Sequence, residues 1–255
     1  MAQVNYFSHA NAADRYAKFR PYFHPLAIER MVRFTDCARF ENALDVACGT
    51  GQSTRALAEV AERVTALDNS VSMLALAPAL PNVVYQIGEA EALPFAAEIF
   101  DLITVGKAFH WFDQDRFLRE AYRVLKPRGW LFIYNNVFMG GMKENAELKP
   151  WVEKSYLAKY ATPPRARKKL TNTYVREFGF DLVGRDNFFN DAIMTPEQLV
   201  GFFLSQSNVI VTVEQGSETI EEVAAWLDQG LQPFFHQPTG TMQFGSDVWY
   251  LRKSD

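Results

Sequence analysis

Short apolar runs alternate with helical patterns between residues 43 and 135. Apolar residues recur at helical spacing after the first run and again after Asp113, whose side chain suits a helix N-cap. Strands that alternate with helices are typical of βαβ units with right-handed crossovers. The pattern therefore predicts an α/β fold built on a doubly wound sheet. The runs that we expect to form strands are 43–47, 63–67, 83–87, 100–106 and 130–134.

The pattern outside this region is less regular. Residues 137–180 read as an insertion, which is too small to hold a core of its own. We therefore expect a single domain over residues 1–255, with an N-terminal cap (1–42), a core (43–135), a lid insertion (137–180) and C-terminal strands and helices (181–255). In the last segment we expect a strand near Ile193, helices at 196–205 and 220–229, and a closing strand at 242–251.

The composition is that of an ordinary globular chain, with 48% apolar and 22% charged residues. A net charge of −4 argues against nucleic acid as a partner, and the one basic run, 165–169, is expected to be a solvated segment. The two cysteines lack metal-site spacing, so we expect no metal. No apolar run approaches about 18 residues, so we expect no membrane partner and a cytoplasmic location.

A glycine loop follows the first predicted strand, at Gly49 and Gly51. Such a loop lets a ligand approach the backbone and directs helix N–H groups towards it. A dinucleotide fingerprint would place glycine or alanine where Thr54 stands. Asp45, at the end of the strand, would repel a pyrophosphate but suits a ligand with an amino group. These two residues disfavour a nicotinamide cofactor and favour S-adenosylmethionine.

An acidic residue, Asp68, ends the second predicted strand. An acid at this place in a doubly wound sheet accepts hydrogen bonds from the hydroxyls of a ribose. Taken alone, such a residue is equally an N-cap or a surface residue. The loop, the strand and the acid together favour an adenosine-containing ligand.

Four segments now match a known family. The segment 44–51 (LDVACGTG) resembles motif I of class I S-adenosylmethionine-dependent methyltransferases, whose fold is a seven-stranded Rossmann-like sheet. Segment 88–95 (GEAEALPF) is similar to the stretch that this family places against adenine, and 100–103 and 125–129 to its fourth strand and the following turn. Segments 16–22 and 110–113 are similar to its small-molecule branch, methyltransferase type 11, which includes trans-aconitate methyltransferase-like proteins.

The resemblance implies the residues that hold S-adenosylmethionine. Asp45 and Gly49 would bind the methionine amino group, the acid directly or through water. Asp68 would bind the ribose. Arg20 would pair with the methionine carboxylate, and Tyr16 would close over the same end. Asn69 and Met73 would border the adenine, and Glu89 and the Ala90 backbone N–H would bind its amine. The remaining residues that the resemblance assigns to the cofactor are Ala47, Gly51 and Gly106.

The acceptor side is less defined. Lys107 stands where many relatives have another polar residue, and with His110, Trp111 and Ser207 it is a candidate for binding the substrate. His110 follows the fourth strand, and its pKa range suits a general base. A structural role for His110, with its ring hydrogen-bonded to a backbone carbonyl, is the favoured interpretation. Arg128 replaces a family glycine, which we expect to affect only the turn.

These observations favour an enzyme that methylates a small organic molecule, preferably at the oxygen of a carboxylate or hydroxyl. The alternative is a non-catalytic, S-adenosylmethionine-binding regulatory protein on the same fold. A nicotinamide-dependent oxidoreductase is disfavoured by Asp45 and Thr54. For the oligomeric state, a monomer and a homodimer both remain open.

Overall fold

The computed structural model describes residues 10–163 and 168–254, and these group into two compact units. The sheet unit takes its residues from Tyr22–Asn136, Arg165–Asn187 and Ser246–Asp255. The helical unit takes its residues from Met1–Pro21, Val137–Pro164 and Phe188–Gly245. The chain therefore enters each unit more than once, and the unit boundaries do not coincide with the four segments expected from the sequence.

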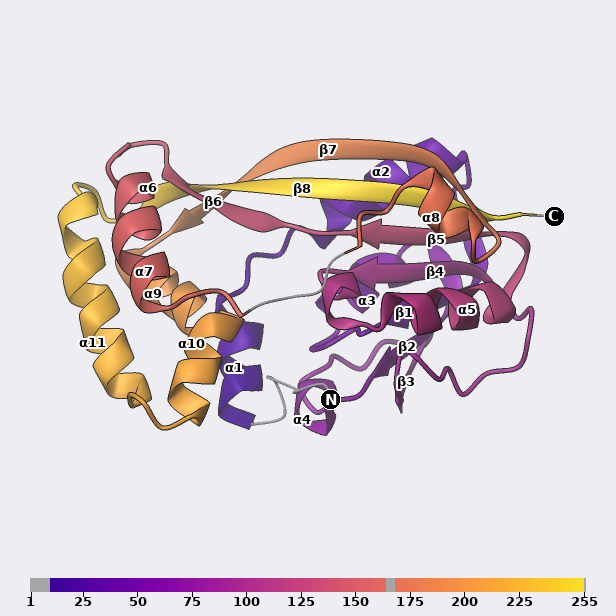
Figure 1. Cartoon of the computed structure of the whole chain (residues 1–255), viewed down its shortest axis with the longest axis horizontal. Coiled ribbons are helices and arrows are strands. Elements are labelled where there is room, and N and C mark those ends of the chain that lie inside the picture. The colour runs from indigo at the N-terminus through magenta and orange to yellow at the C-terminus, as the bar shows by residue number, and fades with distance from the viewer. Residues whose placement is uncertain (1–9, 164–167, 255) are drawn as a thin grey trace. The chain divides into compact units, whose positions relative to one another are not determined.

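Five parallel strands form the larger part of the sheet unit. They are β1 (Phe40–Val46), β2 (Ala61–Asp68), β3 (Val83–Ile87), β4 (Phe100–Gly106) and β5 (Leu125–Tyr134), in the order β3-β2-β1-β4-β5. The C-terminal part of β8 (Gly240–Lys253) pairs antiparallel with β5, and β7 (Phe180–Met194) also pairs with β8 (Figure 1). The predicted α/β fold with a mostly parallel sheet is confirmed.

The helices of the sheet unit connect these strands. They are α2 (His24–Thr35), α3 (Gln52–Ala58), α4 (Val71–Leu74), η1 (Phe109–Trp111), α5 (Gln114–Val124) and α8 (Asn172–Arg176). As predicted, Asp113 caps α5, and its side chain accepts a hydrogen bond from the Arg116 nitrogen over 3.2 Å. Buried Phe117 and Leu118 of α5 pack with Ile103 of β4 in the core of this unit.

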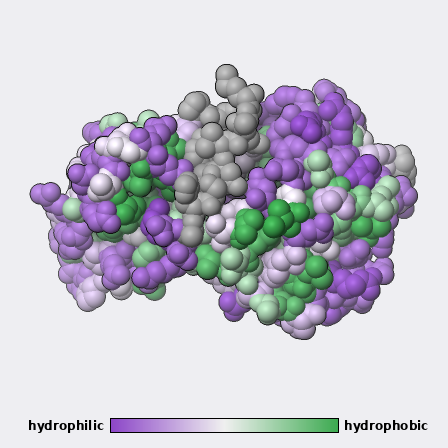
Figure 2. Space-filling model, turned by 90° about the horizontal axis from the view of Figure 1, so that it is seen from below, coloured by the Kyte–Doolittle hydropathy of each residue, from purple (hydrophilic) through white to green (hydrophobic). Residues whose placement is uncertain are grey.

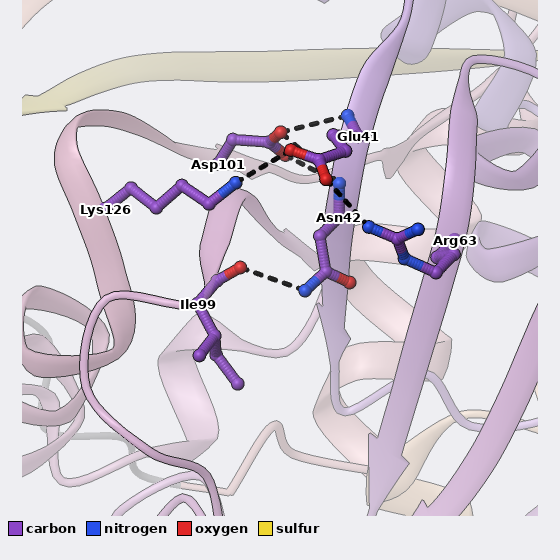
Figure 3. Close-up of polar contacts among 6 residues, drawn as sticks. All are labelled: Glu41, Asn42, Arg63, Ile99, Asp101 and Lys126. Carbon is purple, nitrogen blue, oxygen red and sulfur yellow. Dashed lines mark hydrogen bonds and ion pairs between the residues drawn. The ribbon is translucent and has the colours of Figure 1, made fainter.

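Polar contacts fasten the amino ends of the central strands (Figure 3). The Asp101 carboxylate of β4 accepts hydrogen bonds from the backbone nitrogens of Glu41 and Asn42 in β1. The Glu41 side chain in turn pairs with Arg63 of β2 over 2.9 Å and with Lys126 of β5 over 3.0 Å. These groups are largely exposed, so they contribute modestly to stability, but they favour one register. The opposite, carboxyl edge of the strands is where ligands of such sheets bind.

The helical unit contains α1 (Ala10–Phe19), α9 (Pro196–Leu204), α10 (Ser207–Glu214) and α11 (Ile220–Leu231), which Figure 1 shows grouped together. A further helix runs through α6 (Leu148–Trp151), the π-helical turn η2 (Val152–Tyr156) and α7 (Leu157–Lys159), and η3 is Gln232–Phe234. Strand β6 (Val137–Met142) pairs antiparallel with the N-terminal part of β8. Aromatic rings of Phe138, Phe202 and Phe244 pack against one another in the core of this unit.

Several elements differ from those expected. The strand near Ile193 is the end of a much longer strand, β7, whose exposed and partly buried residues alternate. Strand β6 and helix α10 were not predicted. After Ser70, which caps it, the helix α4 is only four residues long. Of the basic run, residues 165–167 lie outside the described residues, whereas the Lys168 ammonium pairs with Asp115 over 2.7 Å.

On the face shown in Figure 2, hydrophobic residues gather in patches among hydrophilic ones. Exposed large hydrophobic residues include Val84, Phe189 and Ile193. No helix within residues 10–163 and 168–254 has both the length and the apolar character needed to span a membrane. Across the same residues, no three or more side chains are grouped so that they could hold a metal ion.

Candidate functional site

The loop between β1 and α3 has an unusual backbone. Ala47, Gly49 and Gly51 have φ angles of 56°, 56° and 76°, in the left-handed region. A β-carbon on Gly51 would lie 2.9 Å from both the Tyr85 hydroxyl oxygen and Pro78 Cδ. Because both the backbone angle and the space exclude a side chain, position 51 requires glycine. The loop can thus keep its backbone close to a ligand.

Asp45 lies beneath this loop and is fully buried. Its Oδ2 accepts hydrogen bonds from the Ser53 and Thr54 hydroxyls over 2.6 and 2.7 Å, and its Oδ1 accepts one from the Thr104 hydroxyl over 2.8 Å. Burial raises the pKa of Asp45 to about 6, although these hydrogen bonds oppose the shift. The side chain therefore joins β1 to the start of α3 and to β4. A direct contact with a ligand amino group stays a prediction.

Asp68 ties the end of β2 to the same loop. Its Oδ2 accepts a hydrogen bond from the Gly49 nitrogen over 2.8 Å, and its Oδ1 accepts one from the Ser70 nitrogen over 2.8 Å. Burial raises the pKa of Asp68 above its ordinary value, while the hydrogen bonds from backbone N–H groups lower it. Two motifs that are 19 residues apart in the sequence are thus in direct contact.

The residues predicted to border adenine also come together. The Asn69 side-chain nitrogen donates to Glu89 Oε2 over 3.3 Å. Met73 is buried, and its Cε lies 4.0 Å from the place that a β-carbon on Gly49 would occupy. Ala90 is buried beside the core. Beyond the ends of β2 and β3, Asn69 therefore contacts Glu89, and Met73 lies beside Gly49 of the glycine loop.

The polar groups of this loop fit a nucleoside that carries hydroxyl and amino groups. The hydroxyl oxygens of Thr50 and Tyr85 are buried and lack hydrogen-bond partners among the described residues, so a ligand can satisfy them. The negative charge of Asp68 raises the pKa of Asp45 further. The negative charge of Glu89 does the same to the pKa of Asp68. This concentration of carboxylates would repel a pyrophosphate and suits a ligand with positive charge.

The carboxyl ends of β4 and β5 hold a second cluster. A β-carbon on Gly106 would lie 2.8 Å from the Tyr134 hydroxyl oxygen, and the Lys107 nitrogen donates to the Tyr134 carbonyl over 2.8 Å. The same hydroxyl lies 2.9 Å from Nδ1 of buried His24. Burial, with a smaller effect of the Lys107 charge, lowers the pKa of His24 to about 3, so this imidazole is neutral near pH 7. No motif in the sequence marks His24, and through Tyr134 it is part of this edge.

His110 and Trp111 lie in η1, which follows β4. Both are partly buried, and their ring centroids are 4.8 Å apart. Their position beyond the carboxyl end of β4 agrees with the expected region for a substrate. A role of His110 as a base stays a prediction.

Three predicted site residues, Tyr16, Arg20 and Ser207, belong to the helical unit and not to the sheet unit that contains the glycine loop. Arg20 follows α1 and donates from Nη2 to the Ser205 carbonyl over 2.7 Å, and its guanidinium carbon lies 4.9 Å from the ring centre of Tyr16. Ser207 is the first residue of α10 and is buried. It therefore begins a helix, whereas Ser205 ends the preceding one. The structure does not place these residues relative to the glycine loop.

Sequence comparison links this site to a family. A family model described as a methyltransferase domain matches residues 44–133, which contain the loop, Asp68 and Glu89. An uncharacterized methyltransferase of Mycobacterium tuberculosis is 29% identical over 221 residues, or 85% of this chain and 84% of that protein. An uncharacterized methyltransferase of Schizosaccharomyces pombe is 35% identical over 141 residues, 54% of this chain and about half (53%) of that protein. This chain therefore carries a methyltransferase domain over residues 44–133.

A solved structure supports the assignment. The methyltransferase is similar to a protein from Anaeromyxobacter dehalogenans that is described as a type II methyltransferase, with a TM-score of 0.68 and 25% identity. The similarity covers 92% of this chain and 97% of that chain. The predicted fold, family and enzyme class are therefore confirmed.

Some residues of the site had not been singled out from the sequence. Thr54 had been noted only as a departure from a dinucleotide fingerprint, and its hydroxyl in fact holds Asp45. Thr104 and Tyr134 had no motif to mark them. Their only sequence signal is position, because each lies at or near the carboxyl end of a predicted strand.

Proposed function

We propose that this methyltransferase transfers the methyl group of S-adenosylmethionine to an oxygen of a small organic acceptor, either a carboxylate or a hydroxyl. The observation that carries the proposal is the hydrogen bond between Asp68 and the Gly49 nitrogen, which joins the ribose-type acid to the glycine loop. The unsatisfied Thr50 hydroxyl and the clustered carboxylates fit the same ligand. A second candidate function has no comparable support.

The roles in cofactor binding follow from position. Asp68 has further lone pairs for the ribose hydroxyls beyond the two that accept backbone hydrogen bonds. Glu89, already beside Asn69, would accept from the adenine amine, and Ala90 would donate its backbone N–H. Asp45 would act on the methionine amino group through the loop that it holds, or through water. Ala47, Gly51, Met73 and Gly106 would border the ligand, and contacts from Arg20 and Tyr16 to its carboxylate end stay predictions.

When bound, S-adenosylmethionine supplies an electrophilic methyl group on a positively charged sulfur. The protein must align the acceptor oxygen with this group and exclude water, and orientation of this kind lowers barriers by several kcal/mol. A carboxylate acceptor needs no base, because it has no proton to lose. A hydroxyl acceptor needs one, and His110 would then take the proton. Lys107 and Trp111 are the neighbouring candidates for contact with the acceptor.

The proposal is tested by calorimetry with S-adenosylhomocysteine on the whole chain. Asp68→Ala and Gly49→Val are expected to abolish measurable binding. Gly216→Val is the matched control, because Gly216 has a comparable φ of 71° but open space around it. Unchanged affinity in both site variants would contradict the site assignment. Formation of S-adenosylhomocysteine from S-adenosylmethionine with a panel of organic acids and alcohols then tests turnover, and near-normal turnover in His110→Ala would exclude this base.

A further inference from the structure

A buried pair of side chains lies beside the carboxyl end of β4, within the sheet unit. The Tyr134 hydroxyl oxygen, at the end of β5, is 2.9 Å from Nδ1 of His24, the first residue of α2. The two residues are only 1% and 5% exposed, so water has little access to this hydrogen bond. A buried polar group that loses its partner costs free energy, so each side chain holds the other in place.

The pair lies against Gly106, the last residue of β4, which is opposite Tyr134 in the pairing of β4 with β5. A β-carbon at position 106 would lie 2.8 Å from the Tyr134 hydroxyl oxygen and 2.9 Å from its Cζ. Gly106 does not have a positive φ angle, so its backbone conformation alone does not call for glycine. The phenol therefore occupies the space that a side chain at 106 would need, and it supports the Gly106 backbone from that side.

The strained turn after β4 depends on Tyr134 as well. Lys107 has a φ of 59°, in the left-handed region, and its nitrogen donates to the Tyr134 carbonyl over 2.8 Å. A residue with a side chain in this region costs free energy and persists where the surroundings hold it, which is common at ligand sites. This turn lies at the sheet edge where ligands of doubly wound sheets bind. Tyr134 thus contacts both residues of the turn, Gly106 through its ring and Lys107 through its carbonyl.

A neutral hydrogen-bonding partner suits this edge. Burial, and to a smaller extent the charge of Lys107, lowers the pKa of His24 to about 3, so the imidazole carries no charge near pH 7. Phe23 lies near both groups, with its ring centre 4.3 Å from that of His24 and 5.8 Å from the Lys107 ammonium nitrogen. A charged partner for Tyr134 would place a second cation near Lys107 and near a ligand with a positively charged sulfur. The neutral imidazole avoids this repulsion and still holds the hydroxyl.

We propose that Tyr134 and His24 are positioning residues for S-adenosylmethionine, and that their hydrogen bond fixes the Gly106–Lys107 backbone where it borders the cofactor. This proposal rests on the function proposed above, which places Gly106 beside the cofactor. Because both side chains are buried, they act through the turn and not on the methyl group itself. Both residues lie outside 44–133, the part that the family model matches, so α2 and the end of β5 add to the site that the motifs define.

The test is calorimetry with S-adenosylhomocysteine on the whole chain, beside denaturant unfolding of the same variants. Tyr134→Phe removes only the hydroxyl, and His24→Leu removes its hydrogen-bond partner. Each is expected to weaken binding about 2- to 10-fold, the fold-change for one lost neutral hydrogen bond. The double variant is expected to bind no more weakly than either single variant, because all three remove the same contact.

Two further variants separate positioning from packing. His24→Asn puts an amide near the place of Nδ1, where it can bond to the Tyr134 hydroxyl, and is expected to recover most of the affinity that His24→Leu loses. Tyr250→Phe removes the hydroxyl of another buried tyrosine of the same sheet, whose ring, like that of Tyr134, packs on Phe132. It is expected to bind S-adenosylhomocysteine as the wild type does.

Affinity and stability together decide the result. Lower stability of Tyr134→Phe with unchanged affinity would mean a purely structural pair and would overturn the proposal. Losses of affinity that add in the double variant would also overturn it, since two side chains that act independently would give that result. If His24→Leu does not fold, Tyr134→Phe and His24→Asn decide the question by the same comparison. Failure of the proposed function would instead appear as absent S-adenosylhomocysteine binding in the wild type.

Discussion

The Asp68 carboxylate is bonded to the backbone of Gly49, with 2.8 Å between Oδ2 and the Gly49 nitrogen. Its other oxygen accepts from the Ser70 nitrogen, so each carboxylate oxygen accepts a hydrogen bond from a backbone donor on a different side. This arrangement requires two acceptor oxygens. In asparagine one of these oxygens is replaced by an NH2 group. That donor would face a backbone N–H, so one of the two hydrogen bonds would be lost.

Asp68→Asn is therefore expected to distort the loop although it is nearly isosteric. We expect the affinity for S-adenosylhomocysteine to fall about 10- to 100-fold, since hydrogen bonds to charged groups contribute about 1.5–3 kcal/mol. Calorimetry measures the affinity, and circular dichroism confirms that the variant is folded. An affinity within about twofold of the wild type would show that the carboxylate is dispensable for the loop.

The buried Asp45 carboxylate predicts an unusual pH dependence. Its pKa of about 6 in the folded state is above the ordinary value of 3.8, so the folded state binds the proton more tightly. The stability contributed by this group is present below about pH 4 and is lost as the pH rises through about 6. At one pKa unit per about 1.4 kcal/mol, the loss amounts to a few kcal/mol.

Asp45→Asn removes this titration and keeps most hydrogen bonds, because an amide oxygen can accept from Ser53 and Thr54 while the amide nitrogen donates to Thr104. The free energy of unfolding of the variant minus that of the wild type is expected to increase from pH 4 to pH 6.5 and then to level off. Denaturant unfolding at a series of pH values measures the difference. A difference that does not change with pH would contradict the shifted pKa.

The stability that His24 contributes depends on pH in the opposite direction, over an overlapping pH range. The folded-state pKa of this side chain, about 3, is below the ordinary value of 6.5, so the unfolded chain takes up the proton first as the pH falls. Stability is therefore present above pH 6.5 and falls with the pH towards 3. In His24→Asn the side-chain amide can donate a hydrogen bond to the Tyr134 hydroxyl or accept one from it, but nothing titrates. Unfolding measurements are expected to show that this variant loses less stability than the wild type between pH 6.5 and pH 4. An equal loss in both proteins would count against the buried neutral imidazole.

The sequence was a good guide wherever a local pattern determined the structure. Strands β3 and β4 have the predicted bounds, because each is a short apolar run next to turn residues or glycine. The pairing of the glycine loop with Asp68 followed from the same reasoning, since both lie at the carboxyl ends of adjacent parallel strands. The predicted helix after Asp113 formed for an equally local reason, its N-cap.

The remaining elements depend on contacts that are distant in the sequence. Helix α10 is rich in β-branched residues, among them Val209 and Ile210, which have low helix propensity; burial in the core of the helical unit overrides that preference. The His24–Tyr134 contact joins residues that are 110 positions apart. No spacing or motif in a single sequence marks such a pair. The same holds for the Arg20 contact with Ser205.

The glycine loop allows a test that separates backbone strain from lack of space. Gly51 and Gly216 have similar φ angles, 76° and 71°, but a β-carbon at position 51 would lie 2.9 Å from the Tyr85 hydroxyl oxygen, whereas one at 216 would meet nothing within 4 Å. Gly216→Ala is therefore expected to lower the free energy of unfolding by about 1–2 kcal/mol through backbone strain alone.

Gly51→Ala is expected to lose about 1–3 kcal/mol more, because Tyr85 or Pro78 must move to admit the methyl group. It is also expected to weaken S-adenosylhomocysteine binding, whereas Gly216→Ala leaves binding unchanged. Denaturant unfolding and calorimetry on the two variants measure both effects. Equal destabilisation of the two variants would mean that the residues around Gly51 move at little energetic cost to admit the methyl group. Close packing beneath the loop would then not be what holds its backbone in place for the ligand.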